Sequence, residues 1–262
     1  MIFGCGSSAG SLGLQSVATC APCLFMPPQE GPAFFDQTVA DKYDQQAARL
    51  APLRDALHLL IGVVFSGLPA QARVLCAGAG TGAELLYLAE KFPQWHFTAV
   101  EPSAPMLEVC RRRAAESGIA SRCVFHEGYL DSLPPSEPFD AATSLLVSQF
   151  ILAPDSRTHF FRSIAERLRP GGYLASADLA ADVTSAAYQS ILEVWLRLMK
   201  TGDVTDEKLK QLRAAYGRDV ALLPVEQVSA IIAAGGFEAP VLFLQTGLIH
   251  AWCATRSIES VA

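Results

Sequence analysis

A glycine-rich segment near residue 80 has the residue types that bind a nucleoside cofactor. Gly78, Gly80 and Gly82 recur at alternate positions directly after an apolar run. Glycines at such a junction let the backbone turn tightly and let a ligand approach the main chain. Glu101 ends the next apolar run, roughly 20 residues beyond the loop, where a carboxylate can hold both ribose hydroxyls. The loop and the acid together predict a nucleoside-binding site.

The spacing of the glycines narrows the choice of cofactor. Dinucleotide sites use G-x-G-x-x-G, in which the third glycine packs a helix against a strand, whereas this loop reads G-x-G-x-G. A nicotinamide-dependent oxidoreductase is therefore disfavoured. Each part also has an ordinary alternative, since glycines serve plain turns and Glu101 would suit a solvated strand end.

The elements that position these residues alternate between strand-like and helix-like segments. Short apolar runs separated by amphipathic stretches predict a parallel sheet covered by helices on both faces. Ser103 has the side chain of an N-cap for the second of these helices. The predicted strands are 73–77, 97–100, 123–126, 141–146 and 173–177, and the predicted helices are 82–91, 104–117 and 156–168, the last stopped by Pro170-Gly171-Gly172.

The remaining segments are predicted to form a helical cap and a closing hairpin. Apolar residues at three- and four-residue steps indicate helices over 34–65, interrupted at Pro52, and over 186–200, 205–216 and 225–234. Apolar runs over 241–245 and 249–255 predict an antiparallel pair. We therefore expect a poorly ordered tail over 1–32 and one domain over 33–256. Within that domain, 34–66 would form an N-terminal helical cap and 179–220 a helical insertion over the active site.

At this point the chain resembles the class I S-adenosylmethionine-dependent methyltransferases, whose first motif reads roughly acid-x-G-x-G-x-G. Further likenesses lie at 101–103, at Phe139-Asp140-Ala141-Ala142, at 168–174 and at Ala234-Gly235-Gly236-Phe237. The resemblance runs from about Phe34 to Arg256. It implies an α/β, Rossmann-like seven-stranded sheet, order 3-2-1-4-5-7-6 with strand 7 antiparallel, plus N-terminal and inserted capping helices. It also implies S-adenosyl-L-methionine as cofactor and S-adenosyl-L-homocysteine as product.

The resemblance assigns cofactor-binding roles by position. Gly78, Ala79 and Gly80 would lie against the amino-acid portion of the cofactor, with Gly82 completing the loop. Glu101 would bind the ribose. Leu145 and Leu146 would face the methionine portion. The adenine would be flanked by Pro102 and Met106 and bordered by Gly128, Tyr129 and Leu130, although Met106 and Tyr129 would also suit the apolar core.

Two residues depart from the pattern of the family. Cys76 stands where the first motif usually has an acid that orients the methionine ammonium, and Tyr129 stands where many members have an Asp that bonds the adenine amino group. A buried ammonium without acceptors is costly. A main-chain carbonyl or another side chain must therefore substitute for the missing acid.

Some features are similar to the tRNA wobble-uridine carboxymethyltransferase branch, which uses a carboxylated cofactor. These are Met106, Ser148-Gln149-Phe150 and the segment near Phe243-Leu244. However, Leu145 stands where that branch has an Asn, and Arg54 where it has a Tyr. An ordinary methyl donor and a small organic acceptor fit better.

Methyl transfer asks mainly for positioning and exclusion of water, because the sulfonium is already activated. A general base is needed only where the acceptor must lose a proton. The candidates near the carboxyl ends of the strands are Asp178, His126 and His250, of which His250 would also suit a core position. The acceptor cleft would draw on Tyr43, Arg54, Gln149, Phe150 and Trp195, although Trp195 would also suit the core of the cap.

Composition limits the location and the partners. The net charge is −6 and basic residues are scattered, so a nucleic-acid partner is disfavoured. Mean hydropathy is +0.27, but no charge-free apolar run approaches the ~20 residues that span a bilayer. The seven cysteines, an odd number, suggest free thiols in a reducing, cytoplasmic setting. Cys20-Ala-Pro-Cys23 lacks a second pair, so no metal site is predicted.

The sequence therefore predicts an S-adenosylmethionine-dependent methyltransferase that acts on a small organic acceptor by in-line transfer. We expect a monomer or a homodimer without membrane association. An RNA- or protein-directed methyltransferase is an alternative. A non-catalytic S-adenosylmethionine-binding protein is another, and the missing acid at Cys76 is its best support.

Overall fold

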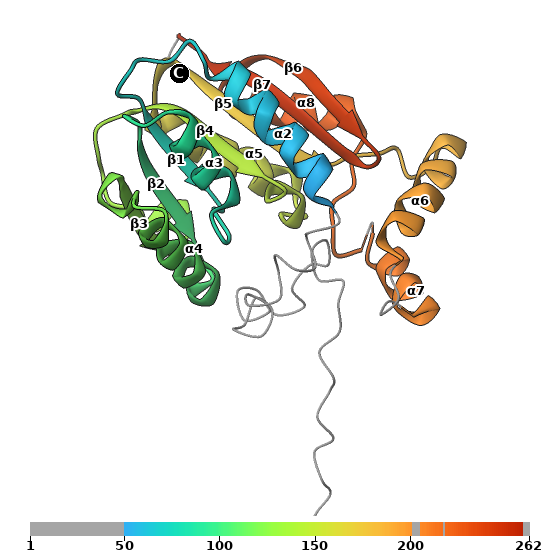
Figure 1. The fold of residues 1–262 in the computed structure, drawn as a ribbon. Coiled ribbons are helices and arrows are strands. Elements are labelled where there is room, and N and C mark those ends of the chain that lie inside the picture. The colour runs from blue at the N-terminus through green and yellow to red at the C-terminus, as the bar shows by residue number, and fades with distance from the viewer. Residues whose placement is uncertain (1–49, 201–204, 217, 259–262) are drawn as a thin grey trace, which may run out of the picture.

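The computed structural model describes residues 50–200, 205–216 and 218–258. Their centre is a seven-stranded sheet of order β3-β2-β1-β4-β5-β7-β6 (Figure 1). Strand β7 is antiparallel to β5 and β6, and the other neighbouring pairs are parallel, so the predicted topology is confirmed. The strands are β1 (Arg73–Ala77), β2 (His96–Glu101), β3 (Cys123–Glu127), β4 (Phe139–Leu145), β5 (Leu168–Leu179), β6 (Phe237–Thr246) and β7 (Ile249–Arg256).

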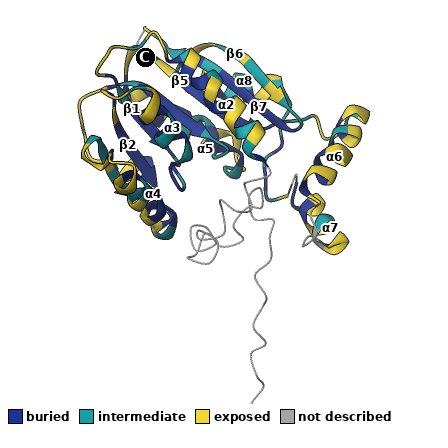
Figure 2. Ribbon diagram, in the orientation of Figure 1, coloured by how far each residue is buried: buried dark blue, intermediate teal, exposed yellow. Residues whose placement is uncertain are grey.

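Helices cover both faces of the sheet, which buries the central strands (Figure 2). On one face lie α2 (Ala51–Val64), α3 (Ala83–Lys91) and α4 (Ala104–Glu116), and Leu57, Leu85 and Leu107 belong to one apolar cluster there. On the other face lie α5 (Pro154–Arg167) and α8 (Val225–Ala234), whose Phe161 and Val228 belong to a second cluster. This two-sided cover explains why the parallel strands are continuous apolar runs in the sequence.

A third apolar cluster joins the remaining helices, α6 (Ala186–Met199) and α7 (Asp206–Ala215), to one end of the sheet. Leu179 at the end of β5 and Ile249 at the start of β7 pack with residues of both helices. Trp195 of α6 donates from Nε1 to the Tyr216 hydroxyl at 2.7 Å, which ties α6 to the chain after α7. Helices α6 and α7 stand beside the sheet in Figure 1.

Proline and glycine residues bear on two of the predicted element ends. Pro52 lies in the first turn of α2, where its missing N–H costs no helical hydrogen bond. The segment before residue 50 lies outside the described residues. Pro170-Gly171-Gly172 does not separate helix from strand as predicted, because it lies inside β5, where the pairing with β4 shifts register between Phe139 and Ala141. Ser103 caps α4, its hydroxyl accepting from Met106 N, as predicted.

A fully buried ion pair fixes the turn that follows β4. Arg157 of α5 lies 3.1 Å from Asp178 of β5, and both side chains are inaccessible to solvent. The Ser148 hydroxyl and the Gln149 amide donate to the two Asp178 oxygens at 2.7 and 2.9 Å. Arg157 Nε donates to Ser148 Oγ at 2.8 Å. The chain after β4 is therefore held to the carboxyl end of β5 by buried polar contacts, which are costly to leave half-made.

We expect Asp178→Ala to lower the free energy of unfolding by about 3–5 kcal/mol, because it leaves the Arg157 charge buried without a partner. Urea denaturation would measure the loss. Arg169→Ala is the matched control, since Arg169 pairs with Asp140 at 3.0 Å but is 44% exposed, and its loss should stay within about 1 kcal/mol. Equal, small losses for both variants would contradict a structural role for the buried pair.

Candidate functional site

The glycine loop turns away from β1 over the end of β2. Gly78 N and Ala79 N both donate to Val100 O, at 2.8 and 3.1 Å. Gly78, Gly80 and Gly82 have φ values of 78°, 54° and 82°, a region that favours glycine. A Cβ at Gly78 would lie 2.5 Å from a Val147 methyl, and one at Gly82 would lie 2.5 Å from Cys110 Sγ. The loop therefore needs glycine both for its backbone shape and for its close contacts.

Glu101 joins the end of β2 to this loop. Its Oε2 accepts from Gly80 N and its Oε1 from Ser103 N, both at 2.9 Å. The residue is only 8% exposed, and burial raises the pKa of its carboxyl. A carboxylate can accept about four hydrogen bonds, so each oxygen keeps capacity for a further donor such as a ribose hydroxyl.

The other residues expected at the cofactor come to the same edge, because β1 to β4 run parallel and end together. Met106 is buried beneath the loop, with its methyl 3.7 Å from the Cβ position of Gly80. Gly128 has φ 143°, and Leu130 is buried in the short turn after it. The side chain of Tyr129 is 61% exposed, so it is no core residue. Pro102 and Leu145 are half-buried.

The turn after β4 carries backbone strain beside the glycine loop. Leu146 has φ 60°, a left-handed conformation that costs a leucine of order 1–3 kcal/mol, and its N–H donates to Ala177 O at 2.6 Å. Gln149, expected in the acceptor cleft, is fully buried instead. Its Oε1 accepts from Leu179 N and its carbonyl accepts from Ala221 N, so it links β5 to the chain that returns from the cap. Phe150 is half-buried against the cap cluster.

The three candidate bases lie in different surroundings. Asp178 is enclosed by the ion pair with Arg157 described above. His126 Nε2 lies 2.8 Å from Ser132 Oγ, beside Gly128 at the β3 edge of the sheet. His250 of β7 is the register partner of Asp178 and is 4% exposed, with its Nδ1 3.0 Å from Leu248 O. Burial lowers the pKa of His250, which keeps its imidazole neutral near pH 7.

Trp195 and Tyr43 complete the residues expected at the acceptor. Trp195 is 1% exposed and its ring lies 2.8 Å from the Cβ position of Gly247, so it fills the interior of the cap. Tyr43 lies outside the described residues.

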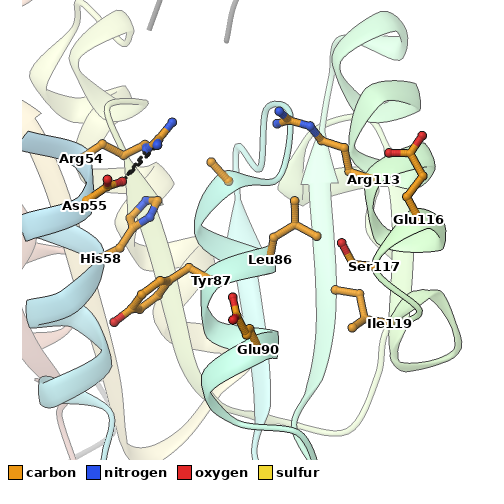
Figure 3. Close-up of a pocket in the computed structure, with 11 residues that line it drawn as sticks. Arg54, Asp55, His58, Leu86, Tyr87, Glu90, Arg113, Glu116, Ser117 and Ile119 are labelled. Carbon is orange, nitrogen blue, oxygen red and sulfur yellow. Dashed lines mark hydrogen bonds and ion pairs between the residues drawn. The ribbon is translucent and has the colours of Figure 1, made fainter. Parts of the chain in front are cut away.

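Arg54 lies at a cavity that sequence reasoning missed. A cavity of about 660 Å³ opens between α2, α3 and α4, on the face of the sheet that these three helices cover (Figure 3). Arg54, paired with Asp55 at 3.0 Å, and His58 line it from α2. Burial, and secondly the Arg54 charge, lower the pKa of His58 to about 4. Arg54 and His58 stand four residues apart on one helix face, and that spacing was the one available signal.

Glu84 is a second residue that sequence reasoning missed. It is the second residue of α3 and only 8% exposed. Burial, with a smaller contribution from the Glu101 charge, raises the pKa of its carboxyl to about 7, against the opposing effect of the amides of Glu84 and Leu85. Burial raises the pKa of the Cys76 thiol well above its ordinary value, and Glu84 is the charge that acts on that thiol most strongly. An acid therefore does lie beside Cys76, although not at the expected sequence position.

Comparison with known proteins agrees with this geometry. A family model described as a methyltransferase domain matches residues 74–172. Residues 74–172 therefore carry a methyltransferase domain, and the strand order of the sheet is that of the class I S-adenosylmethionine-dependent methyltransferase fold. The chain is 31% identical to the erythromycin 3''-O-methyltransferase of Saccharopolyspora erythraea over 115 residues, which are 44% of this chain and 37% of that protein.

Two longer matches cover most of the chain. It is 24% identical to the carboxy-S-adenosyl-L-methionine synthase of Campylobacter curvus over 217 residues, covering 82% of this chain and 91% of that protein. The structure of the mitomycin 7-O-methyltransferase MmcR aligns with a TM-score of 0.61 at 20% identity, covering 85% of this chain and 58% of that one. At these identities the structural likeness shows the fold alone. The chain covers little more than a third of the erythromycin enzyme and under two thirds of MmcR.

The described residues fit a bound S-adenosylmethionine. The loop backbone is bare of side chains at the positions where a Cβ would collide, and Glu101 keeps acceptor capacity at the ribose position. Within residues 50–200, 205–216 and 218–258 there is no group of three His, Cys, Asp or Glu residues able to hold a metal ion. No helix in the same residues is long and apolar enough to cross a membrane. Cys20 and Cys23 lie outside them.

We expect Gly78→Ala to lower the free energy of unfolding by about 1–2 kcal/mol, because a side chain at positive φ is strained and its Cβ would collide with Val147. Gly67→Ala is the control, since a Cβ there would meet no atom within 4 Å. Urea denaturation of both variants measures the difference. A neutral Gly78→Ala would show that the loop does not need glycine at this position.

Proposed function

We propose that this chain transfers a methyl group from S-adenosylmethionine to a small organic acceptor. The observation that carries the proposal is Glu101, whose buried carboxylate is fastened to Gly80 and Ser103 at the ends of two parallel strands. From there it would hold the ribose hydroxyls, with Gly78, Ala79, Gly80 and Gly82 along the amino-acid portion. Pro102, Met106, Gly128, Tyr129 and Leu130 would surround the adenine, and Leu145 and Leu146 the methionine portion.

When bound, the cofactor would supply an activated methyl group to the nucleophilic atom of the acceptor and would be left as S-adenosylhomocysteine, and any proton lost by the acceptor would pass to a base. The chain's own contribution is positioning and exclusion of water. The strained turn at Leu146, held by the Arg157–Asp178 network, fixes the wall between cofactor and acceptor. The cap helices α6 and α7 lie at the same end of the sheet and would enclose the acceptor.

A small organic acceptor is supported by two features. The similar erythromycin and mitomycin enzymes carry small molecules in their names. The net charge of −6 disfavours a nucleic-acid acceptor. The free thiols of Cys76, Cys110, Cys123 and Cys253 support a reducing, cytoplasmic setting. We leave monomer and homodimer as the alternatives for assembly.

Calorimetry with S-adenosylhomocysteine tests the cofactor assignment. We expect the wild type to bind with micromolar affinity and Glu101→Gln to bind about 10- to 100-fold more weakly, because hydrogen bonds to a charged acceptor are lost. Glu127→Gln is the matched control, since Glu127 holds the same register position on β3 but is exposed. Absence of wild-type binding, or equal affinities of the two variants, would contradict the proposal. In a turnover experiment with S-adenosylmethionine, mass spectrometry of the nucleoside product then distinguishes two activities. Methyl transfer yields S-adenosylhomocysteine, whereas carboxylation of the cofactor yields carboxy-S-adenosylmethionine.

For a hydroxyl acceptor we propose His250 as the base, since it is neutral, lies at the cap end of the sheet and is free of an ion pair among the described residues. We expect His250→Gln to lower kcat about 100-fold or more while leaving KM for the cofactor unchanged. His96→Gln is the control, because His96 is an exposed histidine at the amino end of β2. Rates of S-adenosylhomocysteine formation measure both, and an unchanged kcat would exclude His250.

A further inference from the structure

Cys76 leaves the cofactor's ammonium without the acid that the family places there. The Cys76 side chain is fully buried, and burial raises the pKa of its thiol well above the ordinary value, so it stays uncharged at neutral pH. A neutral thiol is a weak acceptor and cannot balance a positive charge. A buried ammonium at this end of β1 needs a negative group from another element.

Glu84 supplies a carboxyl group at this junction. It lies in the first turn of α3, two residues after the last glycine of the loop. Cys76 and Cys110 belong to the apolar cluster on this face of the sheet, and Cys110 Sγ lies 2.5 Å from the Cβ position of Gly82. Glu84 is the strongest charge acting on both thiols. A buried carboxyl at the N-terminus of α3, next to the glycine loop, therefore acts on groups of both β1 and α4.

Nothing in the described part of the chain neutralises this acid. No Lys, Arg or His among those residues forms an ion pair with Glu84, and the other charge that acts on it is the carboxyl of Glu101. Only its own amide and that of Leu85 stabilise the ionised form, as expected at a helix N-terminus. Burying an unpaired carboxyl destabilises a fold, so a ligand cation would account for its presence.

We propose that Glu84 holds the ammonium of the cofactor's methionine portion in place of the acid missing at Cys76. The inference rests on the proposed function, since it concerns the same bound molecule. It assigns the amino-acid end of the site to α3, whereas Glu101 on β2 holds the ribose end. The acid has moved from the strand to the helix that follows it, eight positions along the chain.

The wild type tests this through pH. The Glu84 carboxyl titrates near pH 7 without ligand, and an ammonium beside it would lower that pKa, so binding is favoured by the ionised form. Affinity for S-adenosylhomocysteine should rise up to about 10-fold from pH 6 to pH 8. Affinity for 5′-methylthioadenosine, which lacks the amino-acid portion, should not follow. Cys76, Cys110 and Glu101 also face Glu84, but the thiols stay neutral over this range, and Glu101 acts on both ligands through the ribose.

Substitution gives the second arm, by calorimetry with the same two ligands. We expect Glu84→Gln to weaken S-adenosylhomocysteine binding about 10-fold or more, to leave methylthioadenosine binding within about 2-fold, and to abolish the differential pH dependence. Glu90→Gln, exposed on the same helix, should change neither affinity. Adding Cys76→Asp to Glu84→Gln should restore binding, because it returns an acid to the family's position.

The outcomes separate this inference from the proposed function. If the wild type binds neither ligand, the function itself is wrong. If the wild type binds both but Glu84→Gln leaves S-adenosylhomocysteine unchanged, or weakens both ligands equally, the ammonium role is overturned while the cofactor assignment stands. If Glu84→Gln fails to fold, the wild-type pH comparison decides, and parallel pH profiles for the two ligands overturn the inference.

Discussion

The hydrogen bonds between the glycine loop and the end of β2 hold the candidate site together. Gly78 and Ala79 donate to Val100 O, and Gly80 donates to Glu101, so three successive amides of the loop bind the neighbouring strand. These contacts need positive φ at the glycines and a fixed register between β1 and β2. The packing of α3 and α4 follows from the direction in which the loop leaves the sheet, and Cys110 of α4 packs closely against Gly82. The shape of the loop and the packing of the helices depend on this junction, and under the proposed function cofactor binding and the position of the acceptor would depend on it as well.

Two buried acids at one edge set the electrostatics of the site. Glu101 and Glu84 are each about nine-tenths buried, burial raises the pKa of both, and the charge of Glu101 further disfavours the ionisation of Glu84. Amides of the loop and of the α3 N-terminus offset part of this cost. The ionised carboxylates are therefore poorly stabilised in the free protein. A cationic ligand that also carries hydroxyl donors would stabilise them better. S-adenosylmethionine meets both requirements, because it combines a ribose with an ammonium and a sulfonium.

Local patterns in the sequence predict the sheet, the loop and the acid after β2. Residues 74–77 form a continuous apolar run because both faces of β1 are covered, and the glycines and Ser103 determine structure only within a few residues of themselves. The interior of the site depends instead on contacts between distant segments. Gln149 is buried because it accepts hydrogen bonds from the amides of Leu179 and Ala221. Trp195 is enclosed because Gly247, which has no side chain, leaves room for its ring. Such roles depend on contacts between residues thirty or more positions apart, and the periodicity of apolar residues along the sequence does not predict these contacts.

An experimental structure with S-adenosylhomocysteine bound tests the central claim most directly. We expect the ribose hydroxyls on Glu101 and the amino-acid portion along Gly78 to Gly80, at the carboxyl ends of β1 and β2. A nucleoside bound instead in the cavity between α2, α3 and α4, beside Arg54 and His58, would contradict the account, because the glycine loop and Glu101 would then have only a structural purpose.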